Sequence, residues 1–366
     1  MRFLLSGYYG FGNVGDEALL EVIVSQLRTR HPYAEIDVLS ASPATIPAEL
    51  RIDSTPRWDV KAVRAAIERA DIVLSGGGGL LQNATSVRSL IYYAGIIRTA
   101  VRARRTTMIF AQSIGPLDFW GKTIVRETCK GVAAATVRDE PSKDLLGSLF
   151  PSLRIERTSD PVFLYDPLPA NELVLHGLDP QSSPFAIVNV RPAQGLRGRI
   201  EWIARAVDRL TQAHGLRVAF LPLGGSTDAE ISTEIIRKCR TTPVLLPETP
   251  PAQTAQIIGA ASVVVGMRLH ALIFAVRSGV PFLSIPYDPK VAALTHDLEY
   301  PLEPLFSAMA PPAKMPLDAI DAAVDALWEQ RHELRTHLRN ARERLEKMAA
   351  RNFEVLDDVI AERARP

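Results

Sequence analysis

Residues 2–20 of the chain read RFLLSGYYGFGNVGDEALL, and this stretch indicates the fold class. The apolar run from Phe3 to Ser6 predicts a buried strand, and residues 16–28 have the apolar spacing of a helix. The glycine-rich segment between them is typical of the connection from a parallel strand into the following helix. Strand, loop and helix in this order predict the first βα unit of an α/β sheet.

The same alternation of short apolar runs and longer helical periods continues along the chain. Further strands are expected at 36–40, 72–75, 107–112 and 133–137, with helices at 60–69, 89–102 and 140–149. A second series follows, with strands at 186–190, 218–222, 244–246, 263–266 and 281–285 and helices at 200–214, 228–239, 252–259 and 269–278. Both series predict parallel sheets with helices on both faces.

A length of 366 residues favours two domains of ordinary size. We expect an N-terminal Rossmann-like domain at 1–170, a C-terminal one at 180–315, and a helical segment at 316–366 that packs across both. The Pro-, Asp- and Ser-containing stretch 159–184 includes the predicted linker. A proline-rich stretch, 301–316, precedes a long polar helix from 317 to about 361, whose continuity the sequence leaves open. The expected fold is two doubly wound domains facing a cleft.

Composition and charge narrow the function classes. The formal net charge is +1, so nothing global indicates a nucleic-acid partner. Cys129 and Cys239 are the two cysteines and form no CxxC pair, which argues against a disulfide framework or a cysteine zinc site. The first apolar run is too short for a signal peptide, and no run approaches the length of a membrane span. We therefore expect a soluble protein in the cytoplasm.

The first glycine loop resembles a phosphate-binding turn but does not indicate a dinucleotide site. Residues 10–15 match GxGxxG, yet the acidic residue expected some twenty positions on would be Asp37, which lies inside the second predicted strand. Backbone amides at a glycine loop and a helix N-terminus still favour an anion. Asp16 either caps the helix or contacts a ligand, and both readings stay open.

A second glycine loop, Gly76 to Gly79, follows the strand expected at 72–75. One or two glycines are enough for a tight turn against a helix. Four in succession form a wide nest of backbone amides, which favours a nearby ligand.

Four cationic or titratable side chains follow strands of the second series. Arg191 follows the strand at 186–190, Arg268 and His270 follow 263–266, and Lys290 follows 281–285. Arginine offers paired donors to an anion, and histidine exchanges protons near neutral pH. The alternatives are a structural histidine and an ordinary surface lysine. If adjacent strands bring these groups together, they suit a small, dense polyanion.

Arg138 follows the strand expected at 133–137 and is a further candidate from the first domain. Its alternative role is an ion pair with Asp139 or Glu140. The sequence contains no His-x-Glu-x-His pattern or aspartate cluster, so no metal site is expected.

Taken in order, several of these motifs resemble the polysaccharide pyruvyl transferase family, and its CsaB-type members most. The resemblance lies in residues 7–18, Gly76 to Gln82, Gln112-Ser113-Ile114-Gly115-Pro116, Val137-Arg138-Asp139 and Met267-Arg268-Leu269-His270-Ala271. The family often has Gly where this chain has Ser113 and Asp where it has Asn83. The latter departure puts an acidic role at that position in doubt.

The resemblance implies a GT-B-like fold, phosphoenolpyruvate as co-substrate without another cofactor, and a sugar acceptor in cell-wall polysaccharide assembly and S-layer anchoring, often a lipid-linked disaccharide containing N-acetylmannosamine. Carried over by position, Arg138, His270 and Lys290 are the expected catalytic residues. Arg191 and Arg268, together with His270 and Lys290, are the expected phosphoenolpyruvate-binding residues. The N-terminal glycine loops are the expected acceptor site, with Gly12, Asn13, Asp16, Gly77, Gly78 and Gln82.

Peripheral membrane contact and two other functions stay open. Arg98, Arg102, Arg104 and Arg105 lie beside the apolar segment 91–100 and near Phe119-Trp120, which fits either a solvated helix face or anionic lipid at the inner face of the cell membrane. Residues 262–285 also resemble the donor half of nucleotide-sugar glycosyltransferases, although these usually carry a carboxylate after the loop that holds Arg268 and His270. A non-catalytic anion- or glycan-binding module is the third possibility. The oligomeric state stays open.

Overall fold

The computed structural model describes residues 1–84, 86–166, 178, 183–309 and 316–363. They form two compact units, here called unit 1 (Met1–Tyr165 with Leu345–Pro366) and unit 2 (Asp166–Arg344). The domain boundaries expected at 170, 180 and 315, and most of the linker expected at 159–184, lie outside the described residues. The cleft between the domains stays a prediction.

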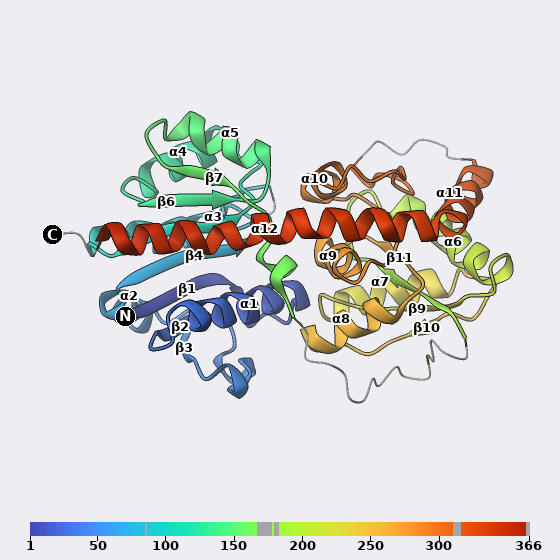
Figure 1. The fold of residues 1–366 in the computed structure, drawn as a ribbon, viewed down its shortest axis with the longest axis horizontal. Helices are drawn as coiled ribbons and strands as arrows, with labels where there is room; N and C mark the ends of the chain where they lie inside the picture. Colours follow the sequence, from blue (N-terminus) through green and yellow to red (C-terminus); the bar gives the residue numbers. More distant parts are fainter. Residues whose placement is uncertain (85, 167–177, 179–182, 310–315, 364–366) are drawn as a thin grey trace. The chain divides into compact units, whose positions relative to one another are not determined.

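Unit 1 contains a seven-stranded parallel sheet with the strand order β3-β2-β1-β4-β5-β6-β7 (Figure 1). Its strands are β1 (Arg2–Tyr9), β2 (Glu35–Ser40), β3 (Asp53–Pro56), β4 (Ile72–Gly78), β5 (Thr106–Gln112), β6 (Ala134–Val137) and β7 (Ile155–Arg157). The chain builds outward from β1 to one edge and then returns to build outward to the other. This order defines a doubly wound Rossmann-like sheet.

Helices cover both faces of the unit 1 sheet. They are α1 (Val14–Arg30), α2 (Val60–Arg69), α3 (Val87–Arg102), α4 (Phe119–Thr128) and α5 (Glu140–Leu149). On one face, Leu4 and Val73 pack with apolar residues of α2 and α3, and α4 and α5 continue the same layer. On the other face, Phe110 of β5 meets Phe353 edge to face at 5.1 Å.

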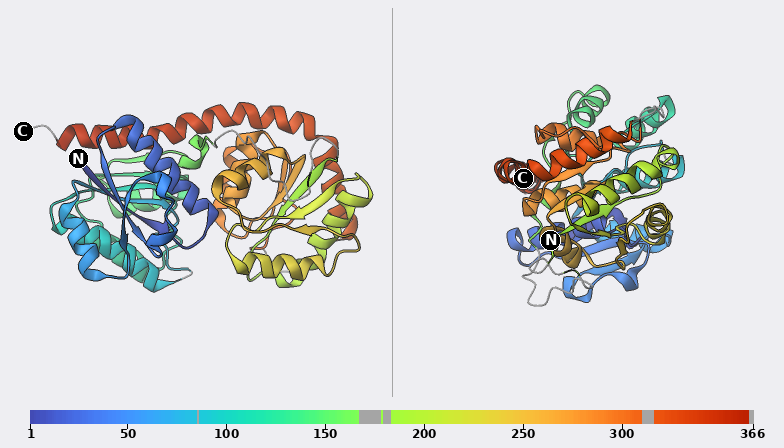
Figure 2. Two further views of the ribbon diagram at one scale, coloured as in Figure 1. Left: turned by 90° about the horizontal axis from the view of Figure 1, so that it is seen from below. Right: turned by 90° about the vertical axis from the view of Figure 1, so that its right-hand side faces the viewer.

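Unit 2 repeats the architecture with a five-stranded parallel sheet in the order β10-β9-β8-β11-β12. Its strands are β8 (Phe185–Asn189), β9 (Arg217–Phe220), β10 (Val244–Leu245), β11 (Val263–Gly266) and β12 (Phe282–Ser284). Its helices are α6 (Ile200–Gln212), α7 (Ser226–Ile236), α8 (Pro251–Ala260), α9 (Leu269–Ser278), α10 (Pro289–Asp297) and α11 (Leu317–Glu329). Figure 2 gives two further views of the fold.

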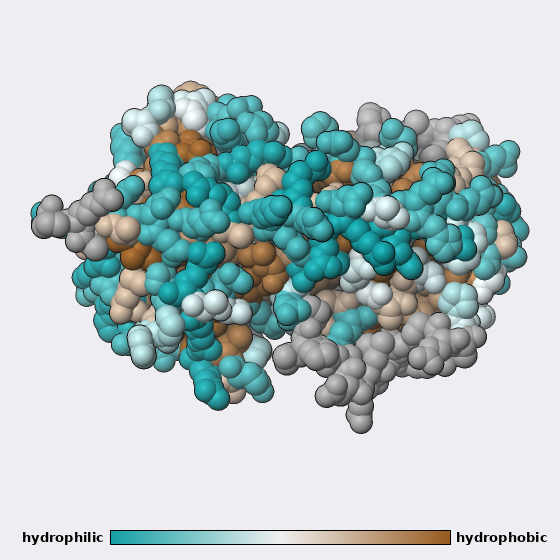
Figure 3. Space-filling model, viewed as in Figure 1, coloured by the Kyte–Doolittle hydropathy of each residue, from teal (hydrophilic) through white to brown (hydrophobic). Residues whose placement is uncertain are grey.

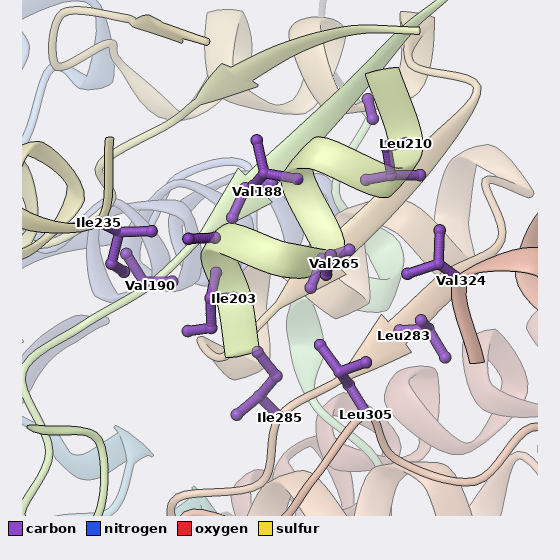
Figure 4. Close-up of a cluster of buried hydrophobic side chains, with 14 of the residues drawn as sticks. Val188, Val190, Ile203, Leu210, Ile235, Val265, Leu283, Ile285, Leu305 and Val324 are labelled. Atoms are coloured by element: carbon purple, nitrogen blue, oxygen red, sulfur yellow. The ribbon is translucent and has the colours of Figure 1, made fainter. Parts of the chain in front are cut away.

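The core of unit 2 explains why its strands read as nearly continuous apolar runs. Val188 and Val265 point toward α6 and pack with Ile203 and Leu210, while Val324 of α11 extends the same cluster (Figure 4). Residues on the opposite face of the strands are buried as well, because α8 and α9 pack against each other and α9 packs on β11 and β12. Strands covered on both faces lose the apolar–polar alternation of a half-exposed sheet.

The last helix, α12 (Arg331–Arg363), follows α11 after Gln330. Its residues up to Arg344 belong to unit 2, and those from Leu345 onward belong to unit 1. Leu338 and Leu345 are buried, whereas the side of α12 that faces the viewer in Figure 3 is mainly hydrophilic. No helix in the described part of the chain combines the length and the apolar character of a membrane span. Packing of residues 316–366 across both domains stays a prediction.

Most predicted elements are present, and the misses have local causes. Strands β3 and β7 were missed because both are short edge strands without an apolar run. Helix α4 was also missed, and α10 begins where only a loop was expected. The expected helix from 317 to about 361 is two helices, α11 and α12. Strand β4 continues through Gly76 to Gly78, beyond its expected end at residue 75.

A buried asparagine ties the end of α12 to the segment after β7. The Asn352 side chain is fully buried and donates to the Ser159 carbonyl at 2.9 Å. It also accepts a hydrogen bond from the Thr158 hydroxyl at 2.8 Å. A leucine of similar size would fill the space but leave these buried polar groups without their partner.

We therefore expect Asn352→Leu to lower the free energy of unfolding of unit 1 by about 1–3 kcal/mol. Thermal denaturation followed by circular dichroism would measure the change. Asn340→Leu is the matched control, because Asn340 is exposed on the same helix. Equal melting temperatures for the two variants would contradict the anchoring role of Asn352.

Candidate active site

The ends of β8, β11 and β12 are aligned at the carboxyl edge of the unit 2 sheet. Gly266 of β11 pairs in register with Asn189 of β8 on one side and with Ser284 of β12 on the other. Arg191 and Arg268 each follow two residues after an aligned position. Because β8 and β11 flank the point where the strand order reverses, this edge is where a doubly wound sheet binds ligands.

Arg268 is held by a buried ion pair. It is the N-cap residue of α9, and its backbone N–H donates to Asn189 Oδ1 at 3.1 Å. Its guanidinium makes a bidentate contact with Asp228 of α7, at 2.5 Å from Nε and 2.7 Å from Nη2. Asp228 is fully buried. The ion pair fixes the orientation of Arg268 and offsets its positive charge.

Gly224 makes room for this arrangement. A Cβ atom built on Gly224 would lie 1.7 Å from Nη2 of Arg268. Since the Arg268 side chain is pinned by Asp228, it cannot yield easily, and only glycine fits beside it.

Arg191 and Tyr287 join the loops after β8 and β12. Nη1 of Arg191 donates to the Tyr287 hydroxyl at 3.1 Å, and the guanidinium carbon lies 4.6 Å from the centre of the ring. Strand β11 lies between these two strands in the sheet, so the contact passes over the strand end that carries Arg268 and His270. Nε of Arg191 is a buried donor with no acceptor among the described residues.

His270 and Lys290 lie in the first turns of α9 and α10. His270 is half-buried. The Lys290 backbone N–H donates to Asp288, which caps α10, and Lys290 Nζ lies 3.6 Å from the other Asp288 oxygen. The structure therefore brings Arg191, Arg268, His270 and Lys290 to one edge of one sheet, where two helix N-termini also favour an anion.

Arg138 belongs to unit 1, where it follows the end of β6. Its side chain is buried, forms an ion pair with Asp160, and donates to Ser113 Oγ at 3.2 Å. The alternative partners considered from sequence are not used: Asp139 instead caps α5 by accepting from the Ser142 N–H at 2.9 Å. A catalytic role for Arg138 stays a prediction.

The first glycine loop is organised around carboxylates of its own chain. Asn13, and not Asp16, is the N-cap residue of α1, and it accepts a hydrogen bond from the Gly15 N–H at 3.1 Å. Asp16 is buried in the first turn of α1, and a Cβ on Gly78 would lie 3.1 Å from its Oδ1. Asp16 and the second glycine loop are therefore neighbours at the β1/β4 reversal of strand order.

The Glu17 carboxylate occupies the group of backbone amides that the sequence predicted as an anion-binding site. The Gly10 N–H donates to Glu17 Oε1 at 2.8 Å, and the amides of Phe11 and Gly12 also stabilise this carboxylate. Burial, reinforced by the negative charge of Asp16, nevertheless raises the pKa of Glu17 to about 7. Sequence analysis missed this residue, because an acidic residue in the first turn of a helix also fits an ordinary interaction with the helix dipole.

The second glycine loop is tightly packed. Gly77 and Gly78 have φ of +74° and +85°, which disfavours a side chain at either position. Gly12 of the first loop also has a positive φ, but a Cβ there would meet nothing within 4 Å. Gln82 is half-buried beyond the second loop. Acceptor binding by Gly12, Asn13, Asp16, Gly77, Gly78 and Gln82 stays a prediction.

Asp228, Asp160 and Tyr287 are the other residues that sequence analysis missed at these edges. Asp228 and Arg268 are forty positions apart, and no local pattern links them. Tyr287 stands three residues before Lys290, the residue that the sequence analysis named after this strand. In the part of the chain described here, no group of three or more His, Cys, Asp or Glu residues could hold a metal ion.

Solved structures share this fold across nearly the whole chain. The UDP-GlcNAc 2-epimerase of Neisseria meningitidis bound to UDP-GlcNAc has a TM-score of 0.64 at 11% identity, over 98% of this chain and 100% of that one. HepE of Anabaena in complex with UDP-glucose has a TM-score of 0.66 at 12% identity, over 99% of this chain and 100% of that one. Phytolacca americana UGT2, complexed with UDP-2fluoro-glucose and pterostilbene, has a TM-score of 0.62 at 10% identity, over 100% of both chains. At such low identity these likenesses define the fold class alone, an α/β protein of the GT-B type.

The chain belongs to the polysaccharide pyruvyl transferase family, whose model matches residues 13–289. It is therefore a transferase. The match includes Arg138, Arg191, Arg268 and His270 and ends one residue before Lys290. No curated protein matches the chain.

The pKa of Glu17 makes stability depend on pH. Between its ordinary pKa near 4.5 and about 7, the folded protein keeps a proton that the unfolded chain releases, so stability falls as pH rises through this window, by up to ~3 kcal/mol. Glu17→Gln stays neutral, and we expect its melting temperature to rise relative to wild type from pH 4.5 to 7 and then level off. Exposed Glu49→Gln is the control. A constant difference between Glu17→Gln and wild type across this range would contradict the raised pKa.

Proposed function

We propose that the protein transfers the pyruvyl group of phosphoenolpyruvate to two hydroxyls of a sugar, forms a cyclic ketal and releases phosphate. The observation that supports this most is the grouping of Arg191, Arg268, His270 and Lys290 at one carboxyl edge of unit 2, within or next to the family match. Phosphoenolpyruvate carries a carboxylate and a phosphate close together. Guanidinium groups, an ammonium group and helix N-termini are suited to both, so no further cofactor is proposed.

In the proposed reaction one proton is added to carbon, and the protons released by the two sugar hydroxyls complete the balance. Protonation of the methylene carbon of phosphoenolpyruvate makes C2 electrophilic, a sugar hydroxyl attacks C2, and the bond from C2 to the phosphate oxygen breaks. A second hydroxyl then closes the ketal on C2. Of the two hydroxyl protons released, one replaces the proton delivered to the methylene carbon and the other leaves with phosphate. His270 is the proposed group for this proton exchange, and Lys290 and the arginines stabilise the leaving phosphate.

The acceptor side is proposed for unit 1, at the glycine loops that contain Gly12, Asn13, Asp16, Gly77, Gly78 and Gln82. As a CsaB-type enzyme, the protein would use a lipid-linked cell-wall glycan precursor containing N-acetylmannosamine and would work in the cytoplasm at the inner face of the membrane. The exposed side chains of Arg98, Arg102, Phe119 and Trp120 on unit 1 support such a contact. The nucleotide-sugar alternative gains no support from structural neighbours that share only the fold.

We expect His270→Ala to reduce pyruvyl transfer by about 10²–10⁴-fold while the melting temperature stays close to wild type. The assay incubates the protein with phosphoenolpyruvate and a panel of aryl and lipid-linked glycosides, and it measures the pyruvyl adduct by mass and acceptor-dependent phosphate release. His296→Ala is the matched control, because this side chain of the same unit is 90% exposed. Wild-type turnover by His270→Ala would contradict the role of His270. Stabilisation by UDP-sugars but not by phosphoenolpyruvate would favour the glycosyltransferase alternative.

A further inference from the structure

Unit 1 contains a buried arginine surrounded by aromatic rings. Arg57 follows β3, and only 4% of its surface is exposed. Its guanidinium carbon lies close to the ring centres of Tyr92 at 4.3 Å, Phe11 at 4.9 Å, Trp58 at 4.9 Å and Tyr93 at 5.1 Å. Its Nη1 donates to the Gly7 carbonyl at 3.2 Å. These contacts join residues from the ends of β1 and β3 and from α3.

The rings take the place of a carboxylate partner. Among the residues that the structure describes, none forms an ion pair with Arg57, and its buried Nε has no acceptor. A desolvated cation without compensation is costly, whereas the negative faces of aromatic rings attract it. The cation therefore holds several ring planes in fixed positions around itself.

Two of the rings around Arg57, those of Trp58 and Phe11, and the adjacent ring of Tyr8 are exposed to solvent. Trp58 is 66% exposed, and Phe11 and Tyr8 are each 39% exposed. Tyr8 stacks on Phe11 with ring centres 4.1 Å apart and planes 11° apart. Large rings are usually covered in a folded chain, so rings that are fixed on one side and exposed on the other indicate a binding surface.

The exposed rings lie at the edge of the sheet expected to receive the acceptor. Tyr8 is at the end of β1, Phe11 is in the first glycine loop beside Gly12, and Trp58 follows β3. In the order β3-β2-β1-β4, the ends of these parallel strands share one edge with the second glycine loop.

We propose that Tyr8 and Trp58 form a stacking platform for a sugar ring of the acceptor, with Phe11 as a support between Tyr8 and Arg57. One face of a pyranose presents C–H groups, which are apolar and slightly positive and complement the negative face of an aromatic ring. The hydroxyls at the rim of the sugar suit the polar loop that begins at Gly12. The identification of the ligand as an acceptor sugar rests on the proposed function.

The position of the platform beside the glycine loops, and not its charge, favours a sugar over a membrane surface. The positive charge of Arg57 is buried beneath the rings, and the exposed charged residues after Trp58 are Asp59, Lys61 and Arg64. The α4 pair, Phe119 and Trp120, has a similar set in Asp118, Lys122 and Arg126. A vesicle measurement therefore has to decide between sugar and anionic lipid at the Trp58 site.

The test compares Trp58→Ala, Phe11→Ala and Trp58→Phe with Tyr33→Ala, a substitution at a ring of unit 1 that is 95% exposed and follows α1. We expect Trp58→Ala and Phe11→Ala to raise KM for the acceptor glycoside roughly tenfold, with KM for phosphoenolpyruvate unchanged. Trp58→Phe should recover much of the loss, and Tyr33→Ala should behave as wild type. An unchanged acceptor KM in Trp58→Ala, with transfer intact, would overturn the platform and leave the proposed function standing.

A binding measurement separates failure of the platform from failure of the proposed function. Saturation-transfer NMR with methyl glycosides of the panel should show transfer to sugar ring protons with wild type and Tyr33→Ala, and much less with Trp58→Ala. This result would support the platform even if wild type transfers no pyruvyl group. Equal transfer with Trp58→Ala and Tyr33→Ala would overturn it. Loss of binding to vesicles of anionic phospholipid in Trp58→Ala but not in Trp120→Ala would also overturn it, because the occupant would then be lipid.

Discussion

The register of three parallel strands is the constraint on which the candidate active site depends. Gly266 is aligned with Asn189 and Ser284, so the chain leaves β8, β11 and β12 at the same level. A parallel sheet has no freedom to shift one of these strands without breaking its ladder and moving buried side chains. The cationic residues that follow the strands are thereby delivered to one edge, although they are distant in sequence.

Buried charged groups near the sheet edges are compensated in three ways. Arg268 is paired with Asp228 and Arg138 with Asp160, so both arginines are fixed by carboxylates. Arg57 is surrounded by aromatic rings, and Glu17 is held by backbone amides. Fixed charges of this kind cost little reorganisation when a ligand binds, because their orientation is already set before the ligand arrives. Arg191 stands out because its contacts are a tyrosine ring and hydroxyl.

Sequence patterns predicted most strands of the two sheets and the loops that carry the candidate site residues. The apolar runs predicted β8, β11 and β12, and their shared edge follows from parallel pairing, so the grouping of Arg191, Arg268, His270 and Lys290 was accessible from sequence. The partners of these groups were not accessible. Asp228 meets Arg268 across forty positions, and the cluster around Arg57 joins three separate segments. Edge strands such as β3 escaped prediction because four residues without an apolar run carry almost no pattern.

A crystal structure of the protein with phosphoenolpyruvate, in the absence of acceptor, tests the central claim most directly. The account predicts the ligand at the carboxyl edge of the unit 2 sheet, with its phosphate or carboxylate within hydrogen-bond distance of Arg191 and of His270 or Lys290. Phosphoenolpyruvate bound at the glycine loops of unit 1, or away from the ends of β8, β11 and β12, would contradict it.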